Sequence, residues 1–352
     1  MPAASNTMTN TVLITGAAGF IVSNVAKEYL SAAPEARVIV FDKYKGDDLA
    51  QEHLRPYADR VEHVFGDIRD KALMRDVVQT YRPQEVIHAA AITHQAQLER
   101  DDPSVFIDVN INGTVSLLEA VKADSGLRRF VYVSTGGVYG EPSERSPAGP
   151  QGEEGPFDPP ELYAVSKYTS ELLVRRYGKL FGFETLRVRF ADVFGPMERA
   201  TGARTTLSLP YGMMRAVLEG RTLKVSSSAL DAKMDIISAE EIALAFTRLL
   251  LQPGLPHDVY NIASGQHLSI RDLLEAFRSV EPRFSYVETT TAEADVTADP
   301  SLTRGRYNAY DVSRMRDLGW QPRPLKEQLE RYRDWVAHDP VNRCPATSPA
   351  RS

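Results

Sequence analysis

Short apolar runs and longer amphipathic segments alternate through the first half of this 352-residue chain. Five runs rich in β-branched residues predict strands over residues 11–15, 37–41, 61–65, 85–89 and 129–134. Segments with apolar positions every three to four residues separate them and predict helices over 20–32, 70–80 and 104–123. Regular alternation of this kind is typical of a parallel sheet covered by helices on both faces. We therefore predict an α/β fold with a doubly wound parallel sheet.

The pattern is interrupted at residues 141–160, where six prolines and three glycines predict a loop. A loop that follows a sheet strand lies over the carboxyl end of the sheet, where α/β proteins bind ligands. A helix is expected next, over 161–181. We expect two domains and a tail, with these boundaries: residues 11–190 plus 236–262 in the first domain, residues 191–235 plus 263–340 in a smaller substrate-binding lobe, and residues 341–352 in a disordered tail. Within the first domain, residues 239–252 are expected to form a helix and residues 258–262 a strand.

Composition narrows the class of protein. The formal net charge of −6 disfavours nucleic-acid binding, which needs a basic surface. The single cysteine, Cys344, rules out an intrachain disulfide, and the seven histidines show no metal-ligand spacing, so no metal is expected. No apolar run reaches the roughly 18 residues of a membrane helix, and the first ten residues are polar. We expect a cytoplasmic protein without a membrane partner.

A glycine loop, GAAGFIV, occupies residues 16–22 directly after the first predicted strand. Gly16 and Gly19 would bring bare backbone N–H groups close to a phosphate at a helix N-terminus. Val22 stands where a third glycine would ease the packing of helix on strand, so it is expected to disturb packing more than phosphate contact. A tight turn without a ligand is the alternative interpretation of this motif.

Asp42 ends the second predicted strand, 23 residues after Gly19. A carboxylate there can accept hydrogen bonds from the adenosine ribose and repels a 2′-phosphate, which favours NAD over NADP. The neighbouring Lys43 keeps NADP open, and a solvated carboxylate at a strand end is the alternative.

Tyr163 and Lys167 lie four residues apart in YAVSK, early in the helix expected after the proline-rich loop. That spacing puts both side chains on one helix face. A tyrosine is a weak base at neutral pH unless a neighbouring cation stabilises its phenolate, and Lys167 can supply that charge. A surface contact between the two side chains is the alternative.

Eight motifs now occur in order along the chain: GAAGFI, Asp42, GDIRD (66–70), HAAA (88–91), NINGTVSLLEA (110–120), VSTGGVYG (133–140), YAVSK (163–167) and YNIASG (260–265). Together they resemble the extended short-chain dehydrogenase/reductase family, the NAD-dependent sugar epimerases and dehydratases, over about residues 11–340. The resemblance implies a Rossmann-type domain with a smaller C-terminal substrate lobe. It also implies NAD as the cofactor, a sugar or nucleotide-sugar substrate, and a homodimer formed by helices near 104–123 and 161–179.

The resemblance also implies roles for individual residues. Tyr163 would be the catalytic acid/base, Lys167 would lower its pKa and bind the nicotinamide ribose, and Thr135 would hydrogen-bond the reacting hydroxyl. The residues implied to hold the cofactor are Gly16, Gly19, Phe20, Ile21, Asp42, Asp67, Ile68, Ala89, Ala90, Ala91, Asn110, Ser134, Tyr163 and Lys167. The chemistry would be hydride transfer at a hydroxyl-bearing carbon.

The chain departs from the family at positions that face the substrate. The dehydratases carry an Asp–Glu pair after the catalytic threonine, whereas this chain has Gly136 and Gly137, which cannot move a proton. Asp192 replaces an asparagine, and Met234 stands where an arginine grips the nucleotide diphosphate. Arg199 and Arg204 either compensate for that arginine, bind a smaller acid, or lie on a solvated loop.

The candidate substrate residues are therefore His94, Gly136, Asp192 and Arg204, and His94 could equally be a residue of the rim. Two alternatives to a nucleotide-sugar epimerase stay open. The first is a dehydrogenase of a smaller polyhydroxylated or natural-product substrate, and the second is a catalytically silent NAD-binding sensor.

Overall fold

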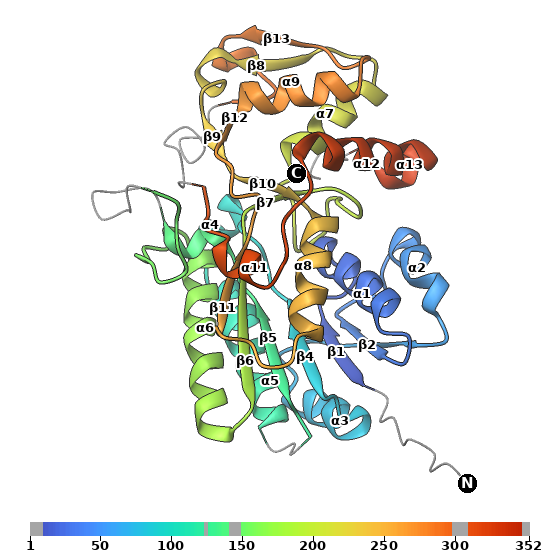
Figure 1. Ribbon diagram of the computed structural model, residues 1–352, viewed down its shortest axis with the longest axis vertical. Coiled ribbons are helices and arrows are strands. Elements are labelled where there is room, and N and C mark those ends of the chain that lie inside the picture. The colour runs from blue at the N-terminus through green and yellow to red at the C-terminus, as the bar shows by residue number, and fades with distance from the viewer. Residues whose placement is uncertain (1–9, 123–125, 141–148, 298–308, 347–352) are drawn as a thin grey trace.

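The computed structural model describes residues 10–122, 126–140, 149–297 and 309–346. In these ranges seven strands form one parallel sheet in the order β11-β6-β5-β4-β1-β2-β3 (Figure 1). The strands are β1 Thr11–Thr15, β2 Arg37–Asp42, β3 Val61–Phe65, β4 Glu85–His88, β5 Arg129–Val133, β6 Glu184–Phe190 and β11 Val259–Ile262. The order runs outward in both directions from β1 and β4, which confirms the predicted doubly wound fold. Each of the five strands predicted in the first half is present to within one residue.

Helices cover both faces of this sheet because successive strand residues point to opposite sides. Val12 and Ile14 of β1 face a core shared with α1 and α8, whereas Leu13 faces a core shared with α3, α5 and α6. The covering helices are α1 Phe20–Ala32, α3 Lys71–Tyr81, α5 Gly113–Val121, α6 Leu162–Phe181 and α8 Ala239–Leu251. Two-sided burial explains why β1 and β2 are nearly continuous apolar runs without polar alternation.

The helix expected over 104–123 is present, but its first part is wound as a π-helix, η2, over Phe106–Asn112, and α5 continues it. Asn110 lies inside this wide turn. Its side-chain amide accepts from the Ile92 N–H at 2.8 Å and donates to the Ile92 carbonyl at 3.0 Å and the Ser166 hydroxyl at 2.9 Å. A π-turn in a helix is often found at a functional site, and here it ties the segment after β4 to α6.

A smaller lobe lies beyond the carboxyl edge of the sheet, at the top of Figure 1. Its core is formed by one cluster of buried side chains from α7, α9, α12 and the short strands β8 and β10. The elements are β7 Asp192–Phe194, α7 Leu209–Leu218, β8 Leu223–Ser226, β9 Lys233–Met234, β10 Ile236–Ser238, β12 Leu268–Ser269, α9 Ile270–Val280, β13 Tyr286–Thr289 and α12 Leu325–His338. The predicted residue boundaries between the two domains stay a prediction.

The prediction of a disordered tail from residue 341 is wrong as far as residue 346. Helix α13 spans Pro340–Arg343, and the Cys344 side chain after it is fully buried in the core of the smaller lobe. Its backbone is also held, because Arg215 donates to the Cys344 carbonyl at 2.7 Å and the Tyr211 hydroxyl to the Pro345 carbonyl at 2.5 Å. Residues 347–352 lie outside the described residues. The tail is mostly polar, so its composition gave no sign that Cys344 is buried in the core of the lobe.

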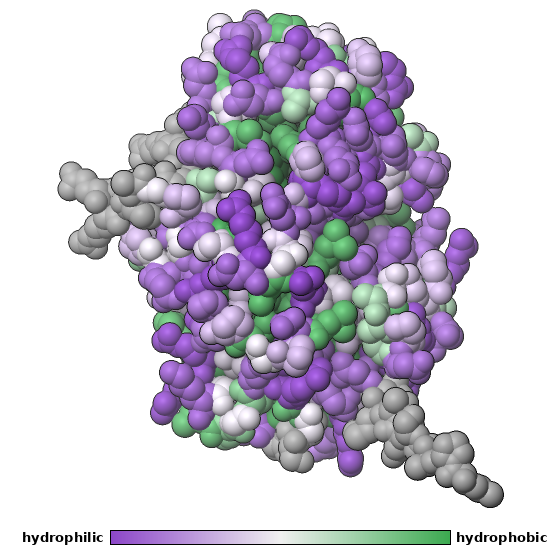
Figure 2. Space-filling view, in the orientation of Figure 1, coloured by the Kyte–Doolittle hydropathy of each residue, from purple (hydrophilic) through white to green (hydrophobic). Residues whose placement is uncertain are grey.

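The proline-rich segment is followed by α6, as expected. Residues 141–148 of the predicted loop lie outside the described residues, and residues 149–160 form no helix or strand beyond a bridge between Gln151 and Tyr310. The remaining short helices are α2 Asp48–Leu54, α4 Ala96–Asp101 and α11 Ser313–Asp317. The viewed face is largely hydrophilic (Figure 2). Among the described helices, none is long and apolar enough to span a bilayer.

Candidate active site

The carboxyl ends of β1 to β5 open into one cleft of about 620 Å³ between the sheet and the smaller lobe. Ligands of doubly wound folds bind at this edge because the strand order reverses there and leaves a crevice. Of the residues implied to hold the cofactor, all but Asn110 line the cleft. Asn110 lies behind it, where it fixes the backbone of Ile92. The catalytic candidates Thr135, Tyr163 and Lys167 line the same cleft.

The glycine loop has room for backbone only. Gly16 has φ +72, and a Cβ there would lie 2.8 Å from the Ala90 nitrogen, while a Cβ on Gly19 would lie 2.8 Å from the Gly16 carbonyl. Gly19 is also the N-cap residue of α1, so unpaired N–H groups of the first turn face the cleft. The loop is therefore a ready anion site, and the diphosphate of a dinucleotide fits it.

Val22 packs into the core that α1 shares with the sheet. Its side chain is 3% exposed and belongs to the same buried cluster as Val12 and Phe246. The valine is accommodated in this core, and the residue also borders the cleft. Its effect on cofactor affinity stays a prediction.

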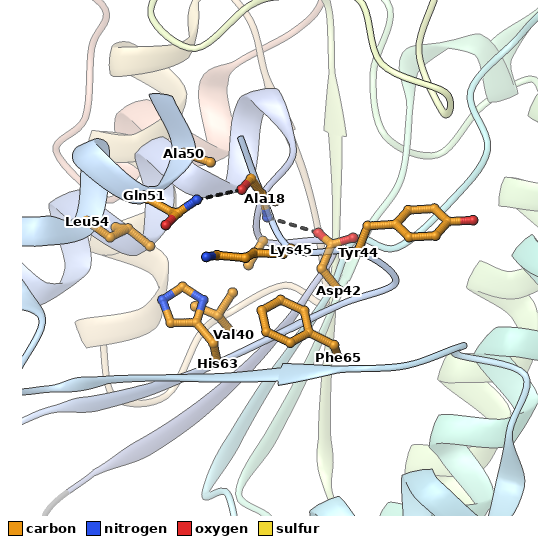
Figure 3. A pocket seen from close by; sticks show the side chains of 12 residues that line it. Ala18, Val40, Asp42, Tyr44, Lys45, Ala50, Gln51, Leu54, His63 and Phe65 are labelled. Atoms are coloured by element: carbon orange, nitrogen blue, oxygen red, sulfur yellow. Dashed lines mark hydrogen bonds between the residues drawn. The ribbon is translucent and has the colours of Figure 1, made fainter. Parts of the chain in front are cut away.

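Asp42 leaves β2 at the rim of the cleft. Its carboxylate accepts from the backbone N–H of Ala18 at 3.0 Å and of Lys43 at 2.8 Å. Burial raises the pKa of this carboxyl, and the backbone donors and Arg199 oppose that rise. A second, mostly apolar cavity of about 190 Å³ lies beside Asp42, bordered by β2, β3 and α2 (Figure 3).

Thr135 and Tyr163 form the chemical centre of the cleft. Thr135 follows β5 and is the N-cap of a 3₁₀ turn, η3 (Gly136–Tyr139), where its hydroxyl accepts from the Gly137 N–H at 3.1 Å. Tyr163, in the first turn of α6, lines the same cleft. Burial raises the pKa of Tyr163, while the Thr135 hydrogen bond and the Arg204 charge lower it. The two hydroxyls can therefore share one substrate oxygen.

Lys167 lies one helical turn after Tyr163 on α6 and is 2% exposed. Its ammonium is 4.4 Å from the centroid of the Tyr132 ring. Burial lowers the Lys167 pKa to about 7, although the Glu171 carboxylate on the next turn raises it. Glu171 itself is bonded to Arg189 at 2.6 and 2.9 Å. A lysine in this state is only partly charged at neutral pH.

The loop between β7 and α7 closes the cleft opposite the sheet. Arg199, 6% exposed, donates from Nε to Asp47 Oδ2 at 2.5 Å and from Nη2 to Asp47 Oδ1 at 2.9 Å. The same Nη2 also reaches the carbonyl of Ala18 in the glycine loop at 3.2 Å. We call this bidentate ion pair the Arg199–Asp47 clasp. It joins the β7–α7 loop to the β2–α2 loop, and both residues line the cleft.

Arg204 lies further along the β7–α7 loop and also lines the cleft. Its guanidinium carbon is 5.2 Å from the centroid of the Phe20 ring, and Nη2 donates to Glu198 at 3.0 Å. Glu198 is fully buried, and burial raises its pKa. Of the four candidate substrate residues, Arg204 is the one that the structure brings into the cleft.

The other three substrate candidates do not line the cleft. His94 lies 3.6 Å from Glu99, which in turn accepts from the Leu162 N–H at the start of α6. Gly136 is buried, and a Cβ on it would lie 1.9 Å from the Tyr310 hydroxyl. Asp192 is exposed at the start of β7, opposite Ile236 of β10. Sequence reasoning also missed Asp47 and Thr93, because no local motif marks a residue whose partner is distant in the chain. It missed Glu198 as well, whose partners Arg204 and Ser208 lie in the same loop without a recognisable motif.

A doubly wound sheet with a glycine loop, an acidic residue after β2 and a Thr–Tyr–Lys centre defines a dinucleotide-binding protein of the short-chain dehydrogenase type. The chain belongs to the NAD-dependent epimerase/dehydratase family, whose model matches residues 12–263. The resemblance inferred from the eight motifs is thereby confirmed.

The chain is similar to several sugar-nucleotide enzymes along most of its length. The UDP-glucose 4-epimerase of Mycolicibacterium smegmatis is 30% identical over 319 residues, 88% of this chain and 93% of that protein. A trifunctional UDP-glucose 4,6-dehydratase, epimerase and reductase of Arabidopsis thaliana is 28% identical over 331 residues. The match covers 94% of this chain but 47% of that protein, so the chain spans about half its length. The crystal structure of the Thermus thermophilus UDP-glucose 4-epimerase with NAD shares the fold, with a TM-score of 0.74 and 24% identity over 94% of this chain and 99% of that one.

Proposed function

We propose that the chain is an NAD-dependent epimerase or oxidoreductase that acts on a hydroxyl-bearing carbon of a sugar or nucleotide sugar. The observation that carries the proposal is the placement of Thr135, Tyr163 and Lys167 in one cleft, with Tyr163 and Lys167 one helical turn apart on α6. A protein that only senses NAD has no need of such an acid/base beside its cofactor. Membership in the NAD-dependent family and the likeness to UDP-sugar epimerases support the same reading.

The residues of the cleft fit NAD. The glycine loop would bind the diphosphate, Asp42 would accept from the adenosine ribose, and Asp67 with Ile68 would flank the adenine. When bound, NAD supplies the hydride acceptor and donor of the reaction. Gly16 and Gly19 are necessary for that fit because a Cβ at either position would collide with backbone atoms.

Tyr163 takes the proton of the substrate hydroxyl, and Thr135 donates to the same oxygen as it becomes a carbonyl. The Tyr163 phenolate is opposed by burial and favoured by the Thr135 hydrogen bond and by the Arg204 charge. Lys167, one turn along α6, would bind the nicotinamide ribose. Burial lowers the pKa of Lys167 to about 7, so this side chain can take up or release a proton near neutral pH.

Elimination of water by the dehydratase route is excluded from the proposal. That route needs an acidic pair directly after the catalytic threonine, where this chain has Gly136 and Gly137. The space over Gly136 is also filled, because the Tyr310 hydroxyl lies against it. Net oxidation, net reduction or epimerisation are the reactions that this centre supports.

We also propose a homodimer through the outer faces of α6 and η2. Leu172, Leu180 and Phe181 of α6 are 40 to 54% exposed, and Ile107 of η2 is 39% exposed. Exposed apolar side chains on adjacent helices are a typical interface. Light scattering of the wild type against Leu172→Glu tests this, since a monomer in both samples contradicts it. The cytoplasmic location stays a prediction from the sequence.

The decisive experiment replaces Tyr163 by Phe and, separately, Thr135 by Ala. UDP-glucose and UDP-glucuronic acid are incubated with each protein, and the sugar products are analysed by NMR. The expected result is turnover by the wild type and a loss of orders of magnitude with Tyr163→Phe. Mass spectrometry of the denatured proteins should show the same NAD content in the wild type and in Tyr163→Phe. NAD binding without turnover of any sugar by the wild type would favour the sensor.

A further inference from the structure

Arg204 is held at the catalytic end of the cleft by its own loop. Thr201 and Arg204 exchange backbone hydrogen bonds at 2.7 and 3.2 Å, which forms a tight turn. The Ala203 carbonyl between them accepts from the backbone and the hydroxyl of Thr93, at 3.0 and 2.9 Å. Thr93 belongs to the segment after β4 that lines the cleft. The turn therefore fixes Arg204 against the wall of the site.

The Arg204 guanidinium is held by one carboxylate, but not all of its N–H groups have a hydrogen-bond acceptor among the described residues. Glu198 accepts from Nη2, and the fully buried Glu198 carboxylate is in turn fixed by the Ser208 N–H at 2.7 Å and the Ser208 hydroxyl. Arg204 Nε is buried and has no hydrogen-bond partner among the described residues. A buried N–H of a charged group costs free energy unless a ligand or water accepts from it. The site thus lacks an acceptor at this place.

The two arginines of the β7–α7 loop have different surroundings in the cleft. The arginine beside the glycine loop is Arg199, which donates to the Ala18 carbonyl and is taken up by Asp47. Arg204 lies over the Phe20 ring at the start of α1, and its charge is one of the causes that lower the Tyr163 pKa. Tyr163 is the group that takes the proton of the substrate hydroxyl in the proposed function.

We propose that Arg204 is a specificity-determining residue that binds a carboxylate on the reacting sugar, so that the chain acts on a sugar acid in preference to the neutral sugar. This inference rests on the proposed function and narrows its substrate class. A planar guanidinium can hold a carboxylate by two hydrogen bonds, whereas a CH₂OH group can accept only one of them. Arg204 Nε is a donor still without a partner among the described residues.

The experiment compares matched sugars that differ only at that group. UDP-glucuronic acid is compared with UDP-glucose, and free glucuronate with free glucose, by kcat/KM and by equilibrium binding to the NAD-loaded protein. The wild type should prefer the acid of at least one pair. Arg204→Met should lower the ratio of acid to neutral kcat/KM by about 10- to 100-fold, the loss expected for hydrogen bonds to a charged group. Arg204→Lys should fall between the two.

Arg199→Met is the matched control, because it removes the same charge from the same loop. It should leave the acid-to-neutral ratio unchanged and act on NAD retention instead. Equal loss for acid and neutral sugars in Arg204→Met and Arg204→Lys would overturn the proposal, as would loss of bound NAD in those variants, which would assign Arg204 to the cofactor. If no sugar is turned over by the wild type, the proposed function fails. Binding of the acids then tests Arg204 separately, and equal binding of acid and neutral sugars overturns the proposal.

Discussion

The Arg199–Asp47 clasp should slow the release of NAD. It connects the two loops that face each other across the cofactor half of the cleft, and Arg199 also holds the glycine loop through the Ala18 carbonyl. Separation of these two loops would break the ion pair, so we expect the pair to contribute to the barrier to NAD release. The informative variants are Arg199→Met and Asp47→Asn. Asparagine is chosen because Asp47 is also the N-cap of α2, and asparagine keeps that role.

The magnitude follows from the burial of the two partners. A hydrogen bond to a charged group contributes about 1.5–3 kcal/mol when it is well buried. Here the arginine is 6% exposed but the aspartate is 51% exposed, so water screens one side of the pair and the contribution is discounted to about 1–2 kcal/mol. Each 1.4 kcal/mol is a factor of ten, so NAD dissociation should become about 5- to 30-fold faster in either variant. The double variant should be no faster than the single ones, because both remove the same interaction.

Dissociation is measured by loading the protein with NAD, adding an excess of labelled NAD and following the exchange by mass spectrometry. Arg37→Met is the control, since Arg37 makes an ion pair of 3.2 Å with Glu62 in which both partners are about half exposed. It should exchange at the wild-type rate. An exchange rate that stays at the wild-type value in both clasp variants would refute the reasoning, as would additive effects in the double variant.

Two further predictions follow from buried groups of the site. Lys167 should oppose folding at neutral pH: the folded protein releases its proton near pH 7 and the unfolded chain near the ordinary lysine pKa of 10.5. Between these values the unfolded chain binds more protons than the folded protein. The unfolding free energy of the wild type should therefore rise with pH by up to about 1.4 kcal/mol per pH unit relative to Lys167→Met. Denaturant melts from pH 7 to 9 measure it, and an unchanged difference in unfolding free energy between the two proteins would contradict it. Gly136→Ala should lower the unfolding free energy by about 1–3 kcal/mol, because its Cβ would overlap the Tyr310 hydroxyl, which lies 1.9 Å away. Gly137→Ala is its control, because a Cβ on Gly137 would lie at an ordinary distance of 3.4 Å from the Ala164 Cβ. Equal melting temperatures of the two variants would show that Tyr310 can move away from a Cβ on Gly136, which would contradict the prediction.

The strands, the glycine loop and the Tyr163–Lys167 pair could be predicted from the sequence because each depends on neighbours in the chain. Two-sided burial makes β1 and β2 apolar runs. A four-residue spacing puts two side chains on one face of α6 wherever that helix lies. The sequence also predicted the edge of the sheet at which these motifs come together, because parallel strands all end on the same side. These regularities determined the fold class and most of the cofactor cleft.

The substrate side was decided by tertiary structure. Arg199 and Asp47 are 152 positions apart, and no local pattern pairs them. The same holds for the Tyr310 hydroxyl over Gly136, which removed that glycine from the cleft, and for the Cys344 anchor that ordered part of the expected tail. The Lys167 pKa of about 7 is likewise a property of its burial between helix and sheet and not of the YAVSK motif. Local periodicity determines which helices and strands form. The path of the loops and the burial of side chains between the lobes determine which side chains come into contact, and these contacts determine the pKa values and hydrogen bonds of the site.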